Sequence, residues 1–97
     1  MNLSELFRNT KTSIVDVRTT EEFENSRVEG SINIPLNLIP DNIESLKKMQ
    51  PLVLCCAAGV RSGQAMEYLK INGLDKVYNG GSWQDAPSAV IRSWVEI

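Results

Sequence analysis

The chain has 97 residues, a formal net charge of -2 and an isoelectric point near 5.0, and 42% of its residues are hydrophobic. This length fits one domain, residues 1–97, which buries roughly two-thirds of the surface that the unfolded chain exposes. The acidic balance argues against nucleic acid or an anionic membrane as a partner, and no apolar run is long enough to span a bilayer.

The cysteine and histidine content narrows the possible chemistry. The two cysteines are adjacent in the sequence, and there is no histidine. Neighbouring cysteines rarely form a disulfide with each other, and no secretory signal follows the first methionine, so we expect a reducing compartment, the cytoplasm. The lack of histidine excludes Cys–His and Ser–His catalysis and histidine-based zinc sites. We expect no metal and no other cofactor.

The first predicted elements are a short helix, a strand and a second helix. Apolar residues at helical spacing predict a helix over residues 3–7. Residues 13–17 form a buried strand, because β-branched side chains dominate there. Thr19 and Glu22 have the spacing of a capping box, in which each side chain satisfies a main-chain N–H of the other residue. This pair predicts a helix that continues to about Asn25.

A second strand and a third helix come next. Residues 31–34 are predicted as a short strand, which Pro35 ends because proline cannot donate to a neighbouring strand. Asp41 and Glu44 repeat the capping-box spacing with an aspartate in place of the hydroxyl. The helix that they begin is expected to stop before Pro51.

The stretch from Leu52 to Gly63 is the centre of the predicted organisation. It begins as an apolar strand over residues 52–55, turns through small residues, and continues as an amphipathic helix. Gly73 fits the left-handed position that commonly follows a helix. A last strand is expected at residues 76–78, closed by two glycines, and a tail helix from Pro87.

Strands that alternate with helices predict an α/β fold with a central parallel sheet of four to five strands and helices on both faces. Ligands of such sheets bind beyond the carboxyl ends of the strands. Cys55 and Cys56 lie at that end of the central strand, and Asp16 and Arg18 at that end of the first strand.

A strand that turns tightly into a helix N-terminus forms a cradle for anions, because main-chain N–H groups converge there and the helix dipole adds positive charge. A cysteine at the entrance of such a cradle is expected to have a depressed pKa and to be partly ionised. Arg61, at the far end of the loop, adds a permanent cation with a planar fork of donors. Together these features make an enzyme active site the leading hypothesis.

Four segments of the sequence form a recognisable series: Asp16-Val17-Arg18 with Glu22-Phe23, Gly30 to Leu36, the loop from cysteine to Arg61 followed by Ser62, and Gly80-Gly81 with Trp83. In this order they resemble a single-domain rhodanese, and the resemblance covers residues 14–83. The resemblance implies a rhodanese-like three-layer fold. It also implies a sulfurtransferase that moves sulfane sulfur from a donor such as thiosulfate to a thiophilic acceptor such as cyanide, through a cysteine persulfide.

By motif position, the resemblance makes Cys56 the persulfide-forming residue and Arg61 a substrate anchor. The other substrate-binding residues that it implies line the loop: Ala57, Ala58, Gly59, Val60 and Ser62. The loop holds no charged side chain between Cys56 and Arg61. Besides small anionic donors, a persulfide or a protein-borne sulfur donor therefore stays open, and the acceptor is a thiol, cyanide or a protein.

Two other functions stay open at this point. Counting from Cys55 gives cysteine, five residues and arginine, the loop length of the cysteine-dependent phosphatases, some of which share the rhodanese-like fold. The second alternative is a carrier that holds a persulfide for a partner enzyme with little turnover of its own. Glycine in the third position after Cys56 favours the sulfurtransferase over the phosphatase.

Several of these residues also have a simpler structural interpretation. Cysteine is among the most buried residue types, so Cys55 is expected to belong to the core. Asp16 and Arg18 are expected to fix neighbouring loops rather than to catalyse. Trp83 is expected to be a packing anchor, and together with Arg18 it is a candidate for the wall of the pocket.

Overall fold

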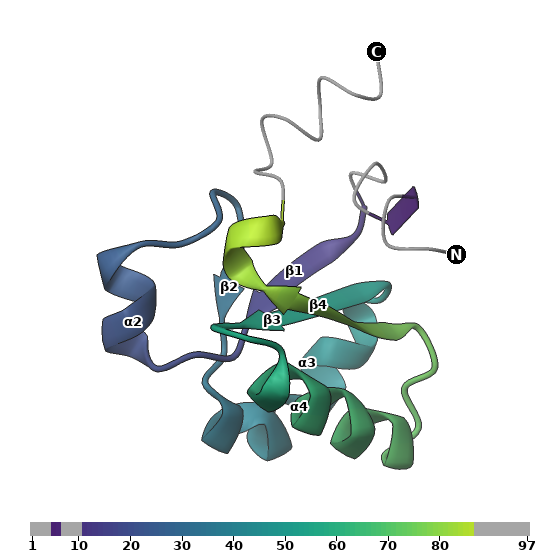
Figure 1. Ribbon diagram of the computed structural model, residues 1–97. Coiled ribbons are helices and arrows are strands. Elements are labelled where there is room, and N and C mark those ends of the chain that lie inside the picture. Colours follow the sequence, from purple (N-terminus) through teal and green to yellow (C-terminus); the bar gives the residue numbers. More distant parts are fainter. Residues whose placement is uncertain (1–4, 7–10, 87–97) are drawn as a thin grey trace.

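The computed structural model describes residues 5–6 and 11–86, which contain a four-stranded, all-parallel sheet with helices packed against it (Figure 1). The strand order is β2-β1-β3-β4, which confirms the expected parallel α/β fold and places β3 inside the sheet. The elements, with η denoting a 3₁₀ helix, are β1 (Ser13–Asp16), α2 (Thr20–Asn25), β2 (Ile32–Asn33), η1 (Leu36–Asn42), α3 (Ile43–Lys48), β3 (Leu52–Cys56), α4 (Val60–Ile71), β4 (Val77–Ser82) and η2 (Trp83–Asp85).

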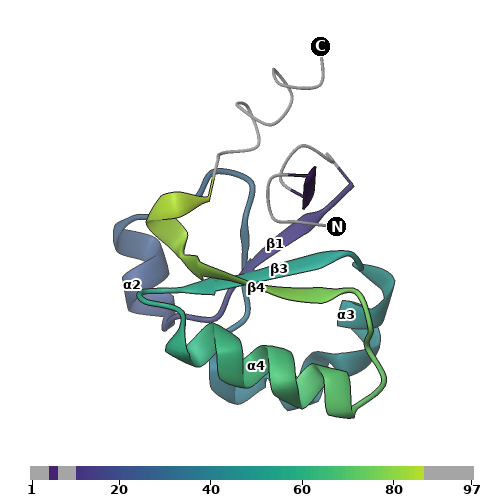
Figure 2. The ribbon, with the colours of Figure 1, turned by 45° about the vertical axis from the view of Figure 1, so that its right-hand side comes forward.

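The main core lies between the sheet and the helices α3 and α4, which cover the same face (Figures 1 and 2). Successive side chains of a strand point to opposite faces, so Leu54 and Cys56 of β3 join this core, whereas Cys55 does not. Cys55 packs instead with Ile14 on the other face, where Trp83 of η2 covers the two. The neighbouring cysteines therefore occupy two different environments.

Parts of the sequence prediction fall beyond the described residues. Only residues 5 and 6 of the expected opening helix are described, and both are helical. The expected tail helix from Pro87 lies outside the described residues altogether. Among the residues that are described, no helix has the length and apolar character needed to cross a membrane.

The two predicted capping boxes have different outcomes. The first is confirmed, because Thr19 Oγ1 accepts from the N–H of Glu22 and the Glu22 carboxylate accepts from the N–H of Thr19. The second prediction is wrong. The 3₁₀ helix η1 runs directly into α3, whose N-cap is Asn42 and lacks a side-chain cap, so Asp41 already lies within a helical turn.

The last strand is longer than predicted. It passes through both glycines and ends at Ser82. Its pairing with β3 shifts by one residue, since Leu54 pairs with Asn79 and Cys55 with Gly81. Such a bulge turns the strand locally, and here it lies beside the carboxyl end of β3.

A buried ion pair fixes the carboxyl end of β1. Asp16 is fully buried and Arg18 is 4% exposed. The guanidinium donates to both carboxylate oxygens of Asp16, at 2.7 to 3.0 Å, and to the carbonyl of Ser26 at 2.7 Å. It also lies 4.5 Å from the centre of the Trp83 ring. This arrangement joins β1, the end of α2 and η2, and it supports the structural role expected for Asp16 and Arg18.

Replacing Arg18 by methionine is predicted to destabilise the fold by about 3–5 kcal/mol, because the Asp16 carboxylate is then buried without its partner. Urea unfolding measures the loss. Lys47→Met is the matched control, since the ion pair of Lys47 with Glu44 is 3.5 Å long and exposed, and its loss should cost about 1 kcal/mol or less. Equal losses in the two variants would contradict the role assigned to the buried pair.

Candidate active site

The candidate site forms where β3 passes into α4. Cys56 is the last residue of β3, so the strand extends one residue further than predicted, and Ala57, Ala58 and Gly59 lead to the first residue of α4. Gly59 has a left-handed backbone with φ of +96°, and a Cβ at this position would lie 3.4 Å from the Cα of Gly81. The left-handed backbone conformation favours glycine here, whereas the contact with β4 would be an ordinary van der Waals contact.

Main-chain N–H groups surround the sulfur of Cys56. The N–H of Gly59 donates to Cys56 Sγ at 3.0 Å, and the hydroxyl oxygen of Ser62 lies 3.4 Å from the same sulfur. Burial by itself raises the pKa of Cys56, but hydrogen bonds from the Ser62 hydroxyl and from the N–H groups of Ser62, Ala58 and Gly59 outweigh it, and the net pKa is lowered. The site therefore favours the thiolate, the reactive form of cysteine.

The loop over this sulfur is apolar and exposed. Cys56 itself is only 1% exposed, whereas Val60 is 69% exposed and Ala57 and Ala58 are also exposed. The buried sulfur is therefore followed in the chain by small, uncharged and exposed side chains.

Cys55 lies in the opposite environment. It is fully buried, and it packs with Ile14 and Val28 on the other face of the sheet. Burial raises the pKa of Cys55 to about 12, and the nearby charge of Asp16 adds to the increase. This thiol is therefore neutral at physiological pH, as expected for a structural cysteine.

Asn79 of β4 ties the parts of the site together, a role that sequence reasoning missed. Its side-chain oxygen accepts from the Ser62 hydroxyl at 2.7 Å and from the N–H of Gly81 at 3.0 Å, while its side-chain nitrogen donates to the carbonyl of Gly59 at 3.0 Å. Gly63 leaves room for this amide, since a Cβ at residue 63 would lie 3.2 Å from its nitrogen. Asparagine is depleted in strands. Its presence next to the predicted last strand is the feature of the sequence that could have marked Asn79 as functional.

The hydrogen bonds of Asn79 determine where the proton of Ser62 lies. The oxygen of the Asn79 amide can only accept, so the Ser62 hydroxyl donates its single proton to it. When Cys56 is protonated, its S–H can donate to the Ser62 oxygen. When Cys56 is ionised, the Ser62 hydroxyl must turn from Asn79 to the sulfur in order to stabilise the thiolate.

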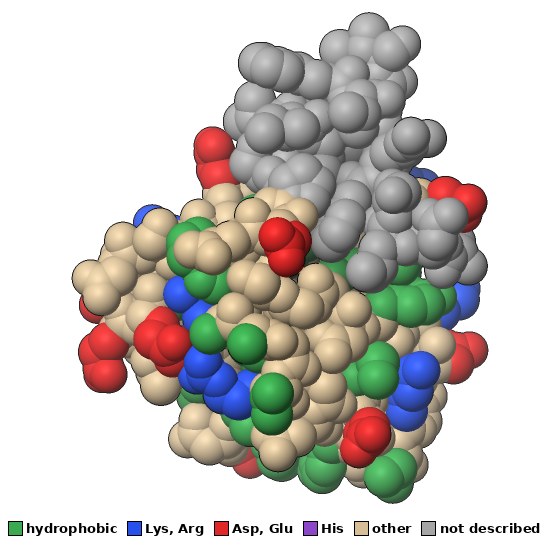
Figure 3. All heavy atoms as spheres, in the orientation of Figure 1, with side chains coloured by type: hydrophobic (Ala, Val, Ile, Leu, Met, Phe, Trp, Pro, Cys, Tyr) green, Lys and Arg blue, Asp and Glu red, His purple; other side chains and the backbone are tan. Residues whose placement is uncertain are grey.

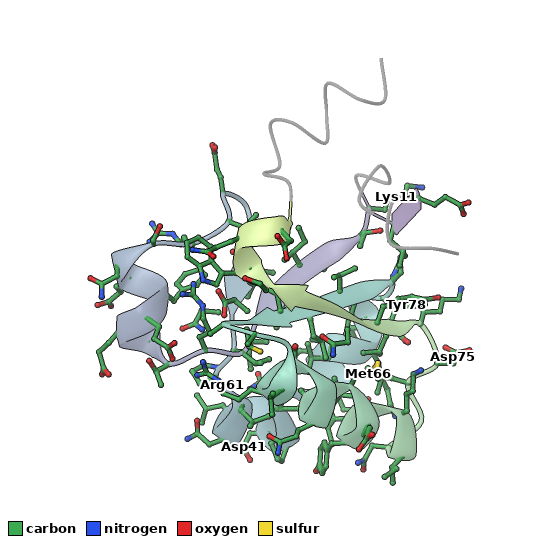
Figure 4. All side chains as sticks on the ribbon, in the orientation of Figure 1. Lys11, Asp41, Arg61, Met66, Asp75 and Tyr78 are labelled. Carbon is green, nitrogen blue, oxygen red and sulfur yellow. The ribbon has the colours of Figure 1, made fainter. Side chains whose placement is uncertain are left out.

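Arg61 is bound by a carboxylate from another element. Its two terminal nitrogens donate to the two carboxylate oxygens of Glu22, at 2.7 and 3.1 Å. The Arg61 side chain extends from the beginning of α4 (Figure 4), and oppositely charged side chains lie against one another between α2 and this helix (Figure 3). The hydrogen bonds from the Arg61 guanidinium, followed by that from the Thr19 N–H, lower the pKa of Glu22 to about 2. Sequence reasoning had assigned Glu22 to the capping box alone.

Arg18 and Trp83, the candidates for the pocket wall, lie together in the ion-pair cluster around Asp16. Trp83 packs against the core cluster that contains Cys55 rather than the one that contains Cys56. Among the described residues, no group of three or more His, Cys, Asp or Glu side chains is placed to hold a metal ion.

Comparison with protein-family models matches residues 2–85 to the rhodanese-like domain. Among curated proteins, the chain is 37% identical over 73 residues to the thiosulfate sulfurtransferase PspE of Escherichia coli, an alignment that covers 73% of this chain and 70% of PspE. It is 36% identical over 69 residues to the uncharacterised protein YqhL of Bacillus subtilis, which covers 71% of this chain but only 55% of that relative.

Among solved structures, a rhodanese from E. coli determined with anions superposes with a TM-score of 0.71 at 32% identity. The superposition covers 79% of this chain and 93% of that one. The family match, the sequence relatives and the shared fold agree with the sequence motifs, and the chain belongs to the rhodanese-like domain family.

Proposed function

We propose that this protein is a sulfurtransferase that carries sulfane sulfur as a persulfide on Cys56. It takes the sulfur from thiosulfate or a persulfide and passes it to a thiophilic acceptor, such as cyanide, a low-molecular-weight thiol or a protein thiol. The observation that carries this proposal is the Cys56 sulfur itself, which accepts a hydrogen bond from the N–H of Gly59 at 3.0 Å beside the N-terminus of α4. Relatives named thiosulfate sulfurtransferases support the same class of reaction.

The reaction proceeds in two displacements. In the first, the Cys56 thiolate attacks the outer sulfur of the donor and forms a new S–S bond. The S–S bond of the donor breaks, and its electron pair leaves with sulfite or, for a persulfide donor, with a thiolate. In the second, the acceptor attacks the terminal sulfur, and Cys56 leaves as the thiolate. Both leaving groups are stable anions, so neither step requires a general acid, and the lack of histidine is no obstacle.

The loop residues stabilise the negative charge on the sulfur in both steps of the reaction. The main-chain N–H groups from Ala57 to Ser62 form the cradle for the thiolate and for the persulfide that replaces it, helped by the dipole of the 12-residue helix α4. Because these donors are main-chain groups, they require no charged side chain within the loop. Two adjacent free cysteines fit a reducing compartment, and we therefore also propose a cytoplasmic location.

The phosphatase alternative has weaker support. It requires Cys55 as the nucleophile, but this side chain is fully buried on the opposite face of the sheet from Cys56. Its raised pKa of about 12 also keeps it protonated. A persulfide carrier would use the same residues as the enzyme, and only the rate at which an acceptor removes the sulfur separates the two.

Replacing Cys56 by serine is predicted to abolish sulfur loading, because the nucleophile is lost while a similar shape is kept. Intact-mass measurement after treatment with thiosulfate or glutathione persulfide checks this, with unfolding by urea to verify the fold. Cys55→Ala is the matched control and should still gain one sulfur atom. Loading that survives in Cys56→Ser, or hydrolysis of p-nitrophenyl phosphate that is lost only on replacing Cys55, would contradict the assignment.

The lowered pKa of Cys56 predicts that its alkylation by iodoacetamide reaches half of its maximal rate at a lower pH than for an ordinary cysteine. The pH profile is best recorded in a Cys55→Ala background, so that a single thiol reacts. Ser62→Ala should move the midpoint to higher pH, because it removes a hydrogen bond that stabilises the thiolate. An unchanged midpoint in Ser62→Ala would show that the hydroxyl does not act on the sulfur.

A further inference from the structure

We propose that Glu22 determines which sulfur donor the site accepts. By binding Arg61, it disfavours donors that carry a sulfonate group, such as thiosulfate, and leaves persulfides as the preferred class. This inference rests on the sulfurtransferase function proposed above. It assigns Glu22 a specificity role for the reaction at Cys56, in addition to its role in capping α2.

Glu22 occupies Arg61 in the way that a donor anion would. The two carboxylate oxygens accept from the two terminal nitrogens of the guanidinium, at 2.7 and 3.1 Å. A sulfonate would use the same planar fork, because Arg binds carboxylates and other oxyanions through two parallel hydrogen bonds. The pair is also electrically neutral, so it offers little long-range attraction to a dianion.

The carboxylate is also held in this position by Thr19, the N-cap of its own helix α2. The N–H and the hydroxyl of Thr19 both donate to the oxygen of Glu22 that receives the shorter Arg61 bond, each at 3.1 Å. Glu22 therefore cannot turn away from Arg61 without disturbing the start of α2. The Arg61 guanidinium and the Thr19 N–H also lower the pKa of Glu22 to about 2, so the carboxylate stays ionised at every pH at which a cysteine thiolate forms.

The loop between Cys56 and Arg61 offers no second cation that could replace Arg61. The residues between Cys56 and Arg61 are alanine, alanine, glycine and valine. Arg18, at the end of the neighbouring strand, is 4% exposed. Its guanidinium already donates hydrogen bonds to Asp16 and to the main-chain carbonyls of Glu22 and Ser26. Among the described residues, the donors that contact the Cys56 sulfur are main-chain N–H groups and the Ser62 hydroxyl, and all of them are uncharged.

A persulfide donor avoids this difficulty. The Cys56 thiolate attacks the outer sulfur, the bond between the two donor sulfurs breaks, and its electron pair leaves on the inner sulfur as a thiolate. No sulfonate has to be accommodated, and no external oxidant or reductant is needed. The residues between Cys56 and Arg61 are uncharged, so they place no charge against the carbon chain of such a donor.

The experiment compares wild type with Glu22→Gln. Glutamine keeps the capping-box geometry but removes the charge that holds Arg61. For thiosulfate with cyanide as acceptor, kcat/KM should rise about 10-fold or more, mainly through KM, as expected for one gained hydrogen bond to a charged group. For glutathione persulfide, kcat/KM should change by no more than about twofold, since that donor does not need the guanidinium.

Two further variants test the cause. Glu21→Gln removes the same charge from the same helical turn, at an exposed residue. It should leave kcat/KM unchanged for both thiosulfate and glutathione persulfide. Glu22→Gln/Arg61→Gln should lose the gain for thiosulfate, because the freed guanidinium is absent. An unchanged kcat/KM for thiosulfate in Glu22→Gln, or an equal loss with both donors, would overturn the proposal. If wild-type Cys56 takes up sulfur from neither donor, the proposed function itself fails.

Discussion

The site depends on one contact, the hydrogen bond from the N–H of Gly59 to the sulfur of Cys56. It exists because a left-handed glycine turns the chain back over the end of β3 within three residues of the cysteine. A residue with a Cβ would be strained in that conformation. The same turn begins α4. The main-chain N–H groups of the loop and the N-terminus of α4 therefore both point toward the sulfur of Cys56.

Around this contact, two side chains from distant elements control what the sulfur can do. Asn79 holds the Ser62 hydroxyl and the Gly59 carbonyl, and so it couples the ionisation of Cys56 to the packing of β4 against α4. Glu22 holds Arg61 and so balances the only cation of the loop. In the proposed reaction, Asn79 thus affects the reactivity of Cys56, and Glu22 affects the charge near an incoming donor.

The sequence predicts the features that depend on local spacing. Strand and helix alternation leads to the parallel sheet, the Thr19–Glu22 spacing leads to the cap of α2, and the strand–loop–helix stretch leads to an anion cradle beside the two cysteines. The choice of Cys56 over Cys55 comes from the resemblance to rhodaneses. It does not predict pairs made between elements. Glu22 and Arg61 are 39 residues apart, and Ser62 and Asn79 are 17 apart. Their contacts follow from how α2, α4 and β4 dock, which periodicity does not encode. The cap predicted at Asp41 does not form for a related reason. Asp41 lies inside the 3₁₀ helix η1, which continues directly into α3, whereas an N-cap residue must precede its helix.

The central claim is that one sulfur, held by main-chain donors, carries the transferred atom. Tandem mass spectrometry of the wild-type protein, loaded with glutathione persulfide, alkylated and digested, tests it most directly, because the fragments distinguish two adjacent cysteines. We expect the extra sulfur to lie on Cys56, and Cys55 to carry none. Extra sulfur on Cys55, or a peptide without extra sulfur while turnover proceeds, would contradict it.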